Sequence, residues 1–350
     1  MSAPTHATTN RALIFQGPYA MSLGEIEMPA VGPDDVLIRV RAVGICGSDI
    51  HGFSGKTGRR APGMVMGHEI AGEVVEVGAA VRGTAVGQRV AVQPILFCGH
   101  CRLCREGRTS LCLNKRMLGV NMGTVGGLSD YVAVPATNVF AFAATVPFAV
   151  GSLAEPLAVG ESAAAAAGIR AGETVAIVGA GMIGLAILLA VKERQPARIF
   201  VVDSIDRRLA LAAGLGAVPV NFRDTAAVAR IRQNTGGHGA DATIEAVGAS
   251  ASVATAQQVA RDGGRIVLIG NSAKMVEVDM QDIVVRGKSI QGVYCYTNDD
   301  FARAVRYLEA NEARVAGFVE MEVPPHEAPA TFTKLARGEL ELLRAVVTQE

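Results

Sequence analysis

The sequence lacks an excess of charge, a long apolar segment and a leader-like start. Its 33 Lys and Arg residues equal its 33 Asp and Glu residues in number, so no nucleic-acid partner is expected on electrostatic grounds. The longest apolar stretch, 182–191, covers about ten residues, whereas a membrane-spanning helix needs roughly 20. No membrane partner is therefore expected. Residues 1–10 are polar and lack the apolar core of a secretion signal.

Cysteine is also scarce, yet four of the six cysteines lie within one loop, about 94–114, at the spacing C-x2-C-x2-C-x7-C. They could form disulfides or be scattered free thiols. In a chain without a visible secretion signal, however, this spacing favours metal binding and a cytoplasmic location. Four thiolates fill a tetrahedral zinc site completely, so a structural zinc is predicted. Its ligands would be Cys98, Cys101, Cys104 and Cys112.

A second, looser set combines Cys46 with His68 and Glu69, some twenty residues further on. A lone Cys is usually a small buried apolar residue, but the segment 46–51 also carries a hydroxyl, a carboxylate and an imidazole. Asp49 could cap a short helix or orient a metal-bound His. A Cys-His-carboxylate set leaves room for water or substrate, which a catalytic zinc requires.

The organisation of the chain changes near residue 155. At 350 residues the chain is long enough for two domains. Short strands with turn residues between them dominate from 11 to about 151, which favours a small barrel-like β domain. Alternating strands and helices follow and predict a doubly wound parallel sheet, so the fold class is α/β. The expected strands are 174–178, 198–202, 241–247 and 265–270, and the expected helices are 182–193, 206–214 and 299–311.

The segment 179–184 fits the pattern G-x-G-x-x-G. The pattern is weak alone, but here it follows a predicted strand and opens a predicted helix, the context that a dinucleotide site needs. Its glycines allow a tight turn, close approach of the pyrophosphate and packing of helix on strand. The alternative is a glycine turn with no ligand. The predicted cofactor-binding residues in this segment are Gly179, Gly181, Met182, Ile183 and Gly184.

A carboxylate at the end of the second strand of this domain bears on the choice of cofactor. Asp203 lies 19 residues after Gly184 and could accept hydrogen bonds from ribose hydroxyls, which favours NAD over NADP. Arg207 and Arg208 follow closely and weaken the argument, because an Arg can hold a 2′-phosphate. Arg208 is included among the predicted cofactor-binding residues.

Together these motifs resemble the zinc-containing medium-chain dehydrogenase/reductases over nearly the whole chain. The matching segments are 46–49, 67–74, 77–78, the four-cysteine loop, 155–157 and 179–184. The resemblance implies a GroES-like catalytic domain at 1–154, a Rossmann NAD-binding domain at 155–296, and a return to the catalytic domain at 297–350. It also implies two zinc ions per subunit.

Within this family the chain resembles the sorbitol-type polyol branch, because Glu155 stands where classical alcohol dehydrogenases place a second Cys. The resemblance implies zinc ligands Cys46, His68 and Glu155, with Glu69 as an alternate or water-mediated ligand. The sequence departs from the branch at two positions. Gly52 replaces a Tyr, and Cys295 stands where an Arg before Tyr296 is expected.

The resemblance implies oxidation of a secondary alcohol or polyol to a ketone. The proton could leave through Ser48 and His51 as a relay, or a zinc-bound water held by Glu155 could serve as the base. One alternative is an amino-alcohol or sugar-phosphate dehydrogenase of the same family. In that reading Arg59 and Arg60 of the loop 55–60 would bind an anion, whereas a solvated basic turn is the simpler interpretation. Another is a non-catalytic nucleotide-binding protein. Relatives are commonly homodimers or homotetramers, and the strand expected at 289–294 could pair across a two-fold axis.

Overall fold

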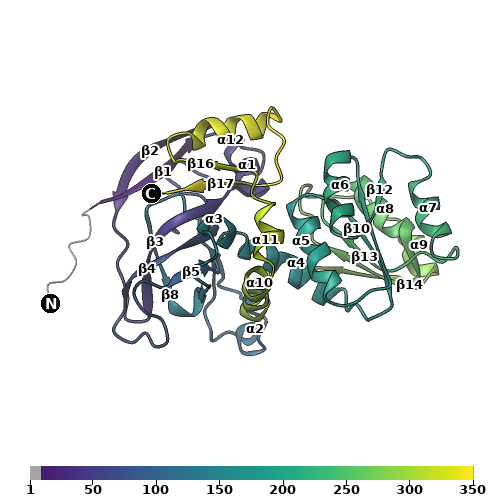
Figure 1. Cartoon of the computed structure of the whole chain (residues 1–350), viewed down its shortest axis with the longest axis horizontal. Helices are drawn as coiled ribbons and strands as arrows, with labels where there is room; N and C mark the ends of the chain where they lie inside the picture. The colour runs from purple at the N-terminus through teal and green to yellow at the C-terminus, as the bar shows by residue number, and fades with distance from the viewer. Residues whose placement is uncertain (1–8, 350) are drawn as a thin grey trace. The chain divides into compact units, whose positions relative to one another are not determined.

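The computed structural model describes residues 9–349, and the chain divides into two compact units. One unit takes the chain up to Glu155 and again from Thr297, and the other takes Pro156–Tyr296. In Figure 1 the first unit is purple, blue and yellow, and the second is teal to green. Segments from both ends of the chain therefore build one unit around a shared core.

The first unit is built on a seven-stranded sheet with the order β16-β17-β3-β4-β5-β9, in which β8 also pairs with β3. Two further antiparallel pairs, β1-β2 and β6-β7, complete its β structure. Along β8 buried and half-buried residues alternate, as in a strand with one face on the core. The strands are β1 Thr9–Gly17, β2 Ala20–Glu27, β3 Asp35–Gly44, β4 Glu69–Val77, β5 Arg89–Val92, β6 Ile95–Leu96, β7 Arg116–Met117, β8 Tyr131–Pro135, β9 Val139–Ala141, β16 Met321–Val323 and β17 Ala345–Thr348.

Two helices of this unit have clear end signals. Helix α10 begins with a capping box in which Thr297 and Asp300 bond each other's backbone N–H groups. Helix α12 ends at Gly338, whose φ of 71° is left-handed and suits glycine. The helices are α1 Gly47–Phe53, α2 Arg102–Arg105, η1 Thr109–Leu111, η2 Ala136–Asn138, α3 Phe148–Gly151, α10 Asn298–Ala310, α11 Glu312–Ala316 and α12 Ala328–Arg337.

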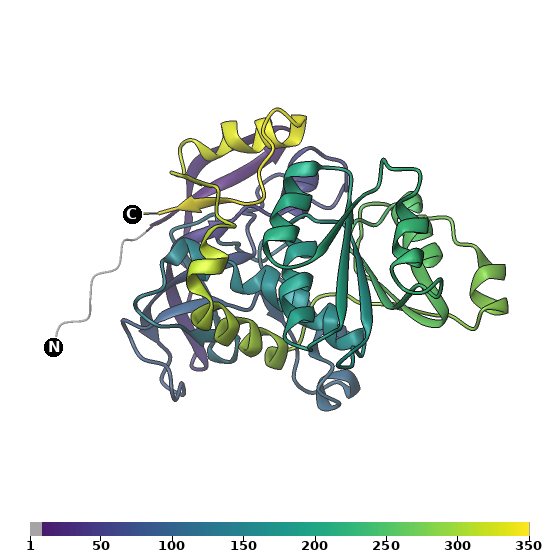
Figure 2. The same ribbon diagram turned by 45° about the vertical axis from the view of Figure 1, so that its right-hand side comes forward.

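The second unit is a six-stranded, fully parallel sheet with the order β12-β11-β10-β13-β14-β15. This is the classical order of a dinucleotide-binding fold, and Figure 2 shows helices on both of its faces. The strands are β10 Thr174–Val178, β11 Arg198–Asp203, β12 Val218–Asn221, β13 Ala240–Glu245, β14 Ala260–Leu268 and β15 Ser289–Gly292. The helices are α4 Ala154–Ala166, which begins in the first unit, and α5 Met182–Lys192, α6 Asp206–Gly214, α7 Ala227–Gln233, α8 Ser250–Val259 and α9 Met280–Val285.

The α/β prediction is confirmed, and differences from the expected elements lie at their ends. Strand β10 and helix α6 have the expected bounds. Strand β13 stops at Glu245, two residues early, because the N–H groups of Val247 and Gly248 donate to the Glu245 carboxylate. Strand β14 begins at Ala260, five residues early. The strand expected at 289–294 ends at Gly292.

Within residues 9–349, no helix has the length and apolar character needed to cross a membrane.

Candidate functional site

Cys46, His68 and Glu69 form one cluster in the first unit. Their ligand atoms, the Cys sulfur, a His ring nitrogen and a carboxylate oxygen, all lie within 4.8 Å of one another. The cluster follows from the pairing of β3 with β4, which sets Gly44 opposite Glu69. A Cβ on Gly44 would lie 2.0 Å from Glu69 Oε2, so the chain needs glycine there. Cys46 and His68 stand just outside the paired ends of these strands.

Asp49 lies beside His68, and its two carboxylate oxygens contact two different side chains. Oδ2 is 3.3 Å from His68 Nδ1, and Oδ1 is 3.2 Å from Arg60 Nη2. Asp49 does not cap α1, because that helix has Cys46 at its N-cap without a side-chain bond. Of the two roles considered for Asp49, the geometry is that of a group orienting His68 through Nδ1.

The charges in this cluster are strongly coupled because the side chains are buried. Burial alone would raise the pKa of Asp49, but His68 and Arg60 bring it below its ordinary value. Burial opposes protonation of His68, yet Asp49 and Cys46 raise its pKa well above the usual range. A metal that binds this imidazole must therefore compete with a proton that Asp49 and Cys46 favour.

Glu69 has a cationic partner that sequence reasoning missed. Arg344 Nη1 lies 2.9 Å from Glu69 Oε1, and both side chains are buried. Arg344 also donates to the carbonyl of Ile45 at 2.6 Å. Burial raises the pKa of Glu69, and Arg344 and His68 oppose this rise without cancelling it. Arg344 immediately precedes β17, whose antiparallel pairing with β3 brings it to the cluster.

Glu155, Ser48 and His51 lie in three different settings. Glu155 is buried near the start of α4, and its charge helps raise the pKa of Arg344, although burial, the largest influence, lowers it. Among residues 9–349 the close ligand cluster consists of Cys46, His68 and Glu69 and does not include Glu155. Ser48 is exposed and His51 half-buried. Burial and nearby Lys56 lower the pKa of His51, which keeps its imidazole neutral at pH 7.

The four cysteines of the loop also converge. Cys112 Sγ lies 3.6 Å from Cys98 Sγ and 4.0 Å from Cys101 Sγ, and all four sulfurs are within 4.8 Å of one another. A zinc tetrahedron with bonds of about 2.3 Å has sulfurs about 3.8 Å apart, so the donor set fits zinc. Backbone N–H groups of Leu113 and Cys104 lower the pKa of Cys101 to about 6, which favours the metal-binding thiolate. Burial and the neighbouring thiols raise the pKa of Cys104 to about 12, so a bound metal would have to displace that proton.

The glycine segment of the second unit forms the turn between β10 and α5. Gly179 has φ 106°, and a Cβ on Gly184 would lie 1.9 Å from the Gly179 carbonyl oxygen. Gly181 is the N-cap of α5, and Met182 is buried while Ile183 is half-buried. The two outer glycines are therefore required by the turn itself, whereas a Cβ on Gly181 would meet only the tip of Arg208, 4.0 Å away.

A cavity of about 250 Å³ lies beside this turn. Of the predicted cofactor residues, Gly179, Asp203 and Arg208 line it. The Asp203 carboxylate accepts hydrogen bonds from the N–H groups of Ala180, at 2.6 Å, and Ile205, at 2.9 Å. Asp203 thus fastens the glycine turn to the end of β11, a structural role that its spacing alone did not reveal.

Two family models match separate parts of the chain. Residues 32–144 match the family described as alcohol dehydrogenase GroES-like domain, and residues 182–310 match that described as zinc-binding dehydrogenase. L-idonate 5-dehydrogenase of Vitis vinifera is 36% identical over 85% of this chain and 83% of its own length. The chain belongs to the zinc-containing medium-chain dehydrogenase/reductase family. It is a zinc-type, nicotinamide-dependent oxidoreductase.

Other members of the family are similarly close. Sorbitol dehydrogenase of Arabidopsis thaliana is 36% identical over 83% of this chain and 81% of its own. An Escherichia coli oxidoreductase of unknown specificity has a TM-score of 0.92, 32% identity, and coverage of 97% and 99% of the two chains. A zinc-binding dehydrogenase of Sinorhizobium meliloti 1021, solved bound to NADP, has a TM-score of 0.90 and 29% identity over 98% and 100%.

The positions that depart from the polyol branch have distinct surroundings in this dehydrogenase. Gly52 is buried, and a Cβ there would lie 2.7 Å from Arg60 Cγ. Arg60 is neither a solvated turn residue nor free to bind an anion, because it is buried against Asp49. This corrects both interpretations of Arg60 from sequence, whereas Arg59 is exposed. Cys295 has φ 59°, and Tyr296 is fully buried.

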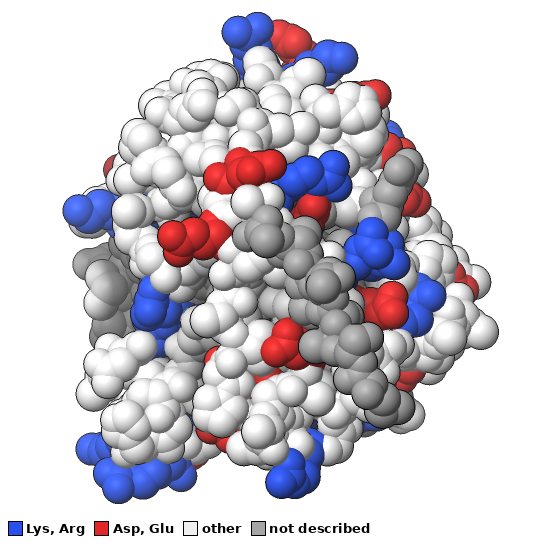
Figure 3. All heavy atoms as spheres, turned by 90° about the vertical axis from the view of Figure 1, so that its left-hand side faces the viewer, with Lys and Arg blue, Asp and Glu red and all other residues white. Residues whose placement is uncertain are grey.

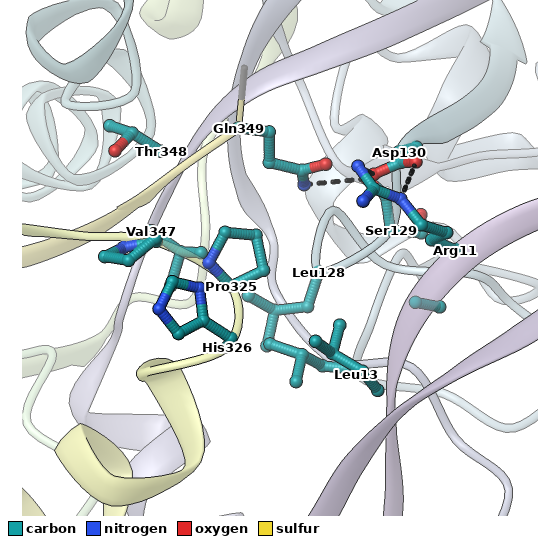
Figure 4. A pocket seen from close by; sticks show the side chains of 13 residues that line it. Arg11, Leu13, Leu128, Ser129, Asp130, Pro325, His326, Val347, Thr348 and Gln349 are labelled. Atoms are coloured by element: carbon teal, nitrogen blue, oxygen red, sulfur yellow. Dashed lines mark hydrogen bonds and ion pairs between the residues drawn. The ribbon is translucent and has the colours of Figure 1, made fainter.

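A separate cavity of about 340 Å³ lies on the first unit between β1 and the C-terminal strand. None of the predicted site residues lines it. Figure 4 shows Arg11 and Asp130 at its rim, where they form an ion pair at 2.8 Å. On the face shown in Figure 3, basic and acidic side chains are intermixed.

Proposed function

We propose that this dehydrogenase oxidises a secondary alcohol or polyol to a ketone and transfers the hydride to NAD, using a zinc ion held by Cys46 and His68. The observation that carries the proposal is the convergence of Cys46, His68 and Glu69 within 4.8 Å, with Asp49 behind the imidazole. This donor set suits zinc and leaves a position for substrate. Zinc bound there would polarise the substrate oxygen as a Lewis acid.

The protein's own residues would position the substrate and move its proton. Ser48 is exposed and lies two residues from Cys46; its hydroxyl would accept the proton of a substrate bound at the cluster and pass its own proton on. His51, whose imidazole is neutral at pH 7 because burial lowers its pKa, can take that proton onward to solvent. Glu155 would complete the ligand set, and Glu69 would be an alternate ligand in exchange with Arg344.

We infer the substrate class from the cationic side chains that could bind a substrate phosphate. The sugar-phosphate alternative relied on Arg59 and Arg60 together, and Arg60 is already paired with Asp49. An uncharged polyol therefore fits the first unit better than a phosphorylated substrate. The relative named sorbitol dehydrogenase supports the same choice, because sorbitol is an uncharged polyol.

For the cofactor we propose NAD. Asp203 lines the cavity beside the glycine turn, where a 2′-phosphate would meet its carboxylate. Arg208 lines the same cavity, so the choice depends on the balance between these two side chains. Asp203→Asn should narrow the preference for NAD over NADP, measured as the ratio of kcat/KM values for the two cofactors.

We propose a homodimer or homotetramer in which β15 pairs with its copy. β15 is the last strand in the sheet order, and its residues are mostly exposed. Three apolar side chains that precede it in the chain are exposed, Val285 and Met275 by 82% and Val284 by 70%. A monomeric mass in solution would contradict this.

We also propose a cytoplasmic location, because free thiols at zinc spacing suit a reducing compartment.

The first experiment is metal analysis followed by NAD reduction with polyols, secondary alcohols, amino alcohols and sugar phosphates, each with and without a strong chelator. The proposal expects two zinc ions per chain and a chelator-sensitive rate with polyols or secondary alcohols. Cys46→Ser should remove one zinc and the activity, whereas Cys295→Ser should keep both zinc ions. Full activity in Cys46→Ser would refute the proposed metal site.

A further inference from the structure

The side chain of Arg60 is buried, although it belongs to a basic loop. Its side chain is 3% exposed, although it follows the exposed residues 55–59. Nη2 lies 3.2 Å from Asp49 Oδ1, and Nη1 donates to the carbonyl of Val120 at 3.2 Å. A guanidinium is withdrawn from water at high cost unless its partners are well placed. These contacts therefore fix where Arg60 can lie.

Gly52 makes this arrangement possible. A Cβ built on Gly52 would lie 2.7 Å from Arg60 Cγ, 3.1 Å from Nε and 3.4 Å from Cζ. Real Cβ atoms do not approach other atoms to within 3.0 Å. The Cγ atom is near the root of the side chain and cannot swing away while the guanidinium keeps its contacts. Any larger residue at position 52 would thus displace Arg60.

The same carboxylate that receives Arg60 faces His68. Asp49 is 1% exposed, and its second oxygen lies 3.3 Å from His68 Nδ1. A carboxylate held at one oxygen only can rotate about its Cβ–Cγ bond, whereas a carboxylate held at both cannot. Groups that orient a metal-bound His typically change metal affinity about 10–100-fold when removed.

We propose that Arg60 is a positioning residue for the metal site: it locks Asp49 against His68, and Gly52 provides the space in which its side chain lies. This inference rests on the proposed zinc site at Cys46 and His68. It assigns the Gly52–Arg60 pair a function in this chain, and it removes Arg60 from the residues available to substrate.

The test uses full-length protein stripped of metal and titrated with Zn²⁺ against a competing chelator, and with Co²⁺ followed by thiolate-to-metal absorption. Arg60→Gln should weaken binding at the Cys46–His68 site by about 10–100-fold and leave the four-cysteine site unchanged. Arg60→Lys should restore part of the loss. Arg59→Gln, an exposed neighbour of the same charge, is the matched control and should bind like the wild type.

Two further variants separate positioning from general stability. Gly52→Ala keeps every charged group but displaces Arg60, so it should weaken the same site and not the four-cysteine site. In an Asp49→Asn background, Arg60→Gln should add little further loss. If Arg60→Gln does not fold, Gly52→Ala decides the matter.

The outcomes distinguish this inference from the proposed function. A wild-type chain that binds one zinc, held by the four cysteines, would overturn the proposed catalytic site and this inference with it. A wild-type chain with two zincs, whose Arg60→Gln and Gly52→Ala variants bind both with unchanged affinity, would overturn the role of Arg60 alone. Equal weakening of both metal sites would overturn it too, because that pattern indicates general destabilisation.

Discussion

Replacing Gly184 or Gly181 by Ala should separate the structural from the ligand-binding role of the glycine turn. A Cβ on Gly184 would lie 1.9 Å from the carbonyl oxygen and 2.7 Å from the carbonyl carbon of Gly179. Both are backbone atoms, so no side-chain rotation relieves the clash and α5 must shift away from β10. A Cβ on Gly181 would meet only the tip of Arg208 at 4.0 Å, and the Gly181 φ of −70° is open to alanine.

The loss of stability in Gly184→Ala can be estimated from overpacking, which costs about 1–3 kcal/mol in a well-packed site. The second unit spans 156–296, which is 296 − 156 + 1 = 141 residues. For a unit of that size, 1 kcal/mol changes Tm by roughly 3–5 °C, so Gly184→Ala should lower Tm by about 3–15 °C. NAD affinity should fall with it, because the turn that receives the pyrophosphate moves.

Gly181→Ala should behave in the opposite way. Its Tm should stay within about 2.5 °C of the wild-type value, since changes without a clash are usually worth under 0.5 kcal/mol. Its NAD affinity should fall, because the second glycine lets the pyrophosphate approach the backbone. The matched control is Gly214→Ala at the end of α6, where no atom lies within 4 Å. Alanine is up to about 1 kcal/mol more favourable than glycine in a helix.

The assays are thermal melts without cofactor and NAD titration by calorimetry. Wild-type Tm and NAD affinity in Gly184→Ala would refute the packing argument. A large fall in Tm for Gly181→Ala, equal to that of Gly184→Ala, would refute the division of roles between the two glycines.

The remaining predictions concern charge and metal. Glu173 accepts hydrogen bonds from Arg170 and Arg265; burial opposes its ionisation, but these partners lower its pKa below 4.5. Its contribution to stability is therefore present above pH 4.5 and lost as pH falls through the lowered pKa. Glu173→Gln should cost about 1.5–3 kcal/mol at pH 7, and urea melts should show the difference narrowing below pH 4.5. Arg344→Met leaves the Glu69 carboxylate buried and uncompensated, so the same melts should show a loss of about 3–5 kcal/mol, with partial recovery when Glu69→Gln is added. Cys101→Ser should reduce zinc from two ions to one per chain by metal analysis and lower Tm, whereas retention of both ions would contradict a four-thiolate site.

Much of the fold and part of the site could be predicted because the signals are local. The spacing of the four cysteines and of the three glycines is set within one loop and one turn, and the structure brings each set together. Strand β10 and helix α6 are likewise bounded by local turn chemistry. The early end of β13 was not predictable from the apolar run. The N–H groups of Val247 and Gly248 donate to the Glu245 carboxylate instead of continuing the strand.

The residues missed from sequence are those whose partners come from a distant part of the chain. Arg344 is 299 positions from Ile45, to which it donates, and only the pairing of β17 with β3 brings it to Glu69. A charged residue shortly before the end of a chain gives no local sign of such burial.

Arg60 shows why composition misleads in a short basic loop. Lys56, Arg59 and Arg60 are equivalent by charge and by sequence neighbourhood, yet only Arg60 has a buried carboxylate within reach and a glycine that leaves space for its side chain. The information that separates them is the missing side chain at Gly52, eight positions earlier. A glycine that departs from a family pattern can therefore mark the place where another side chain occupies the space. In this dehydrogenase that side chain is Arg60, which contacts Asp49, and Asp49 contacts the proposed metal ligand His68.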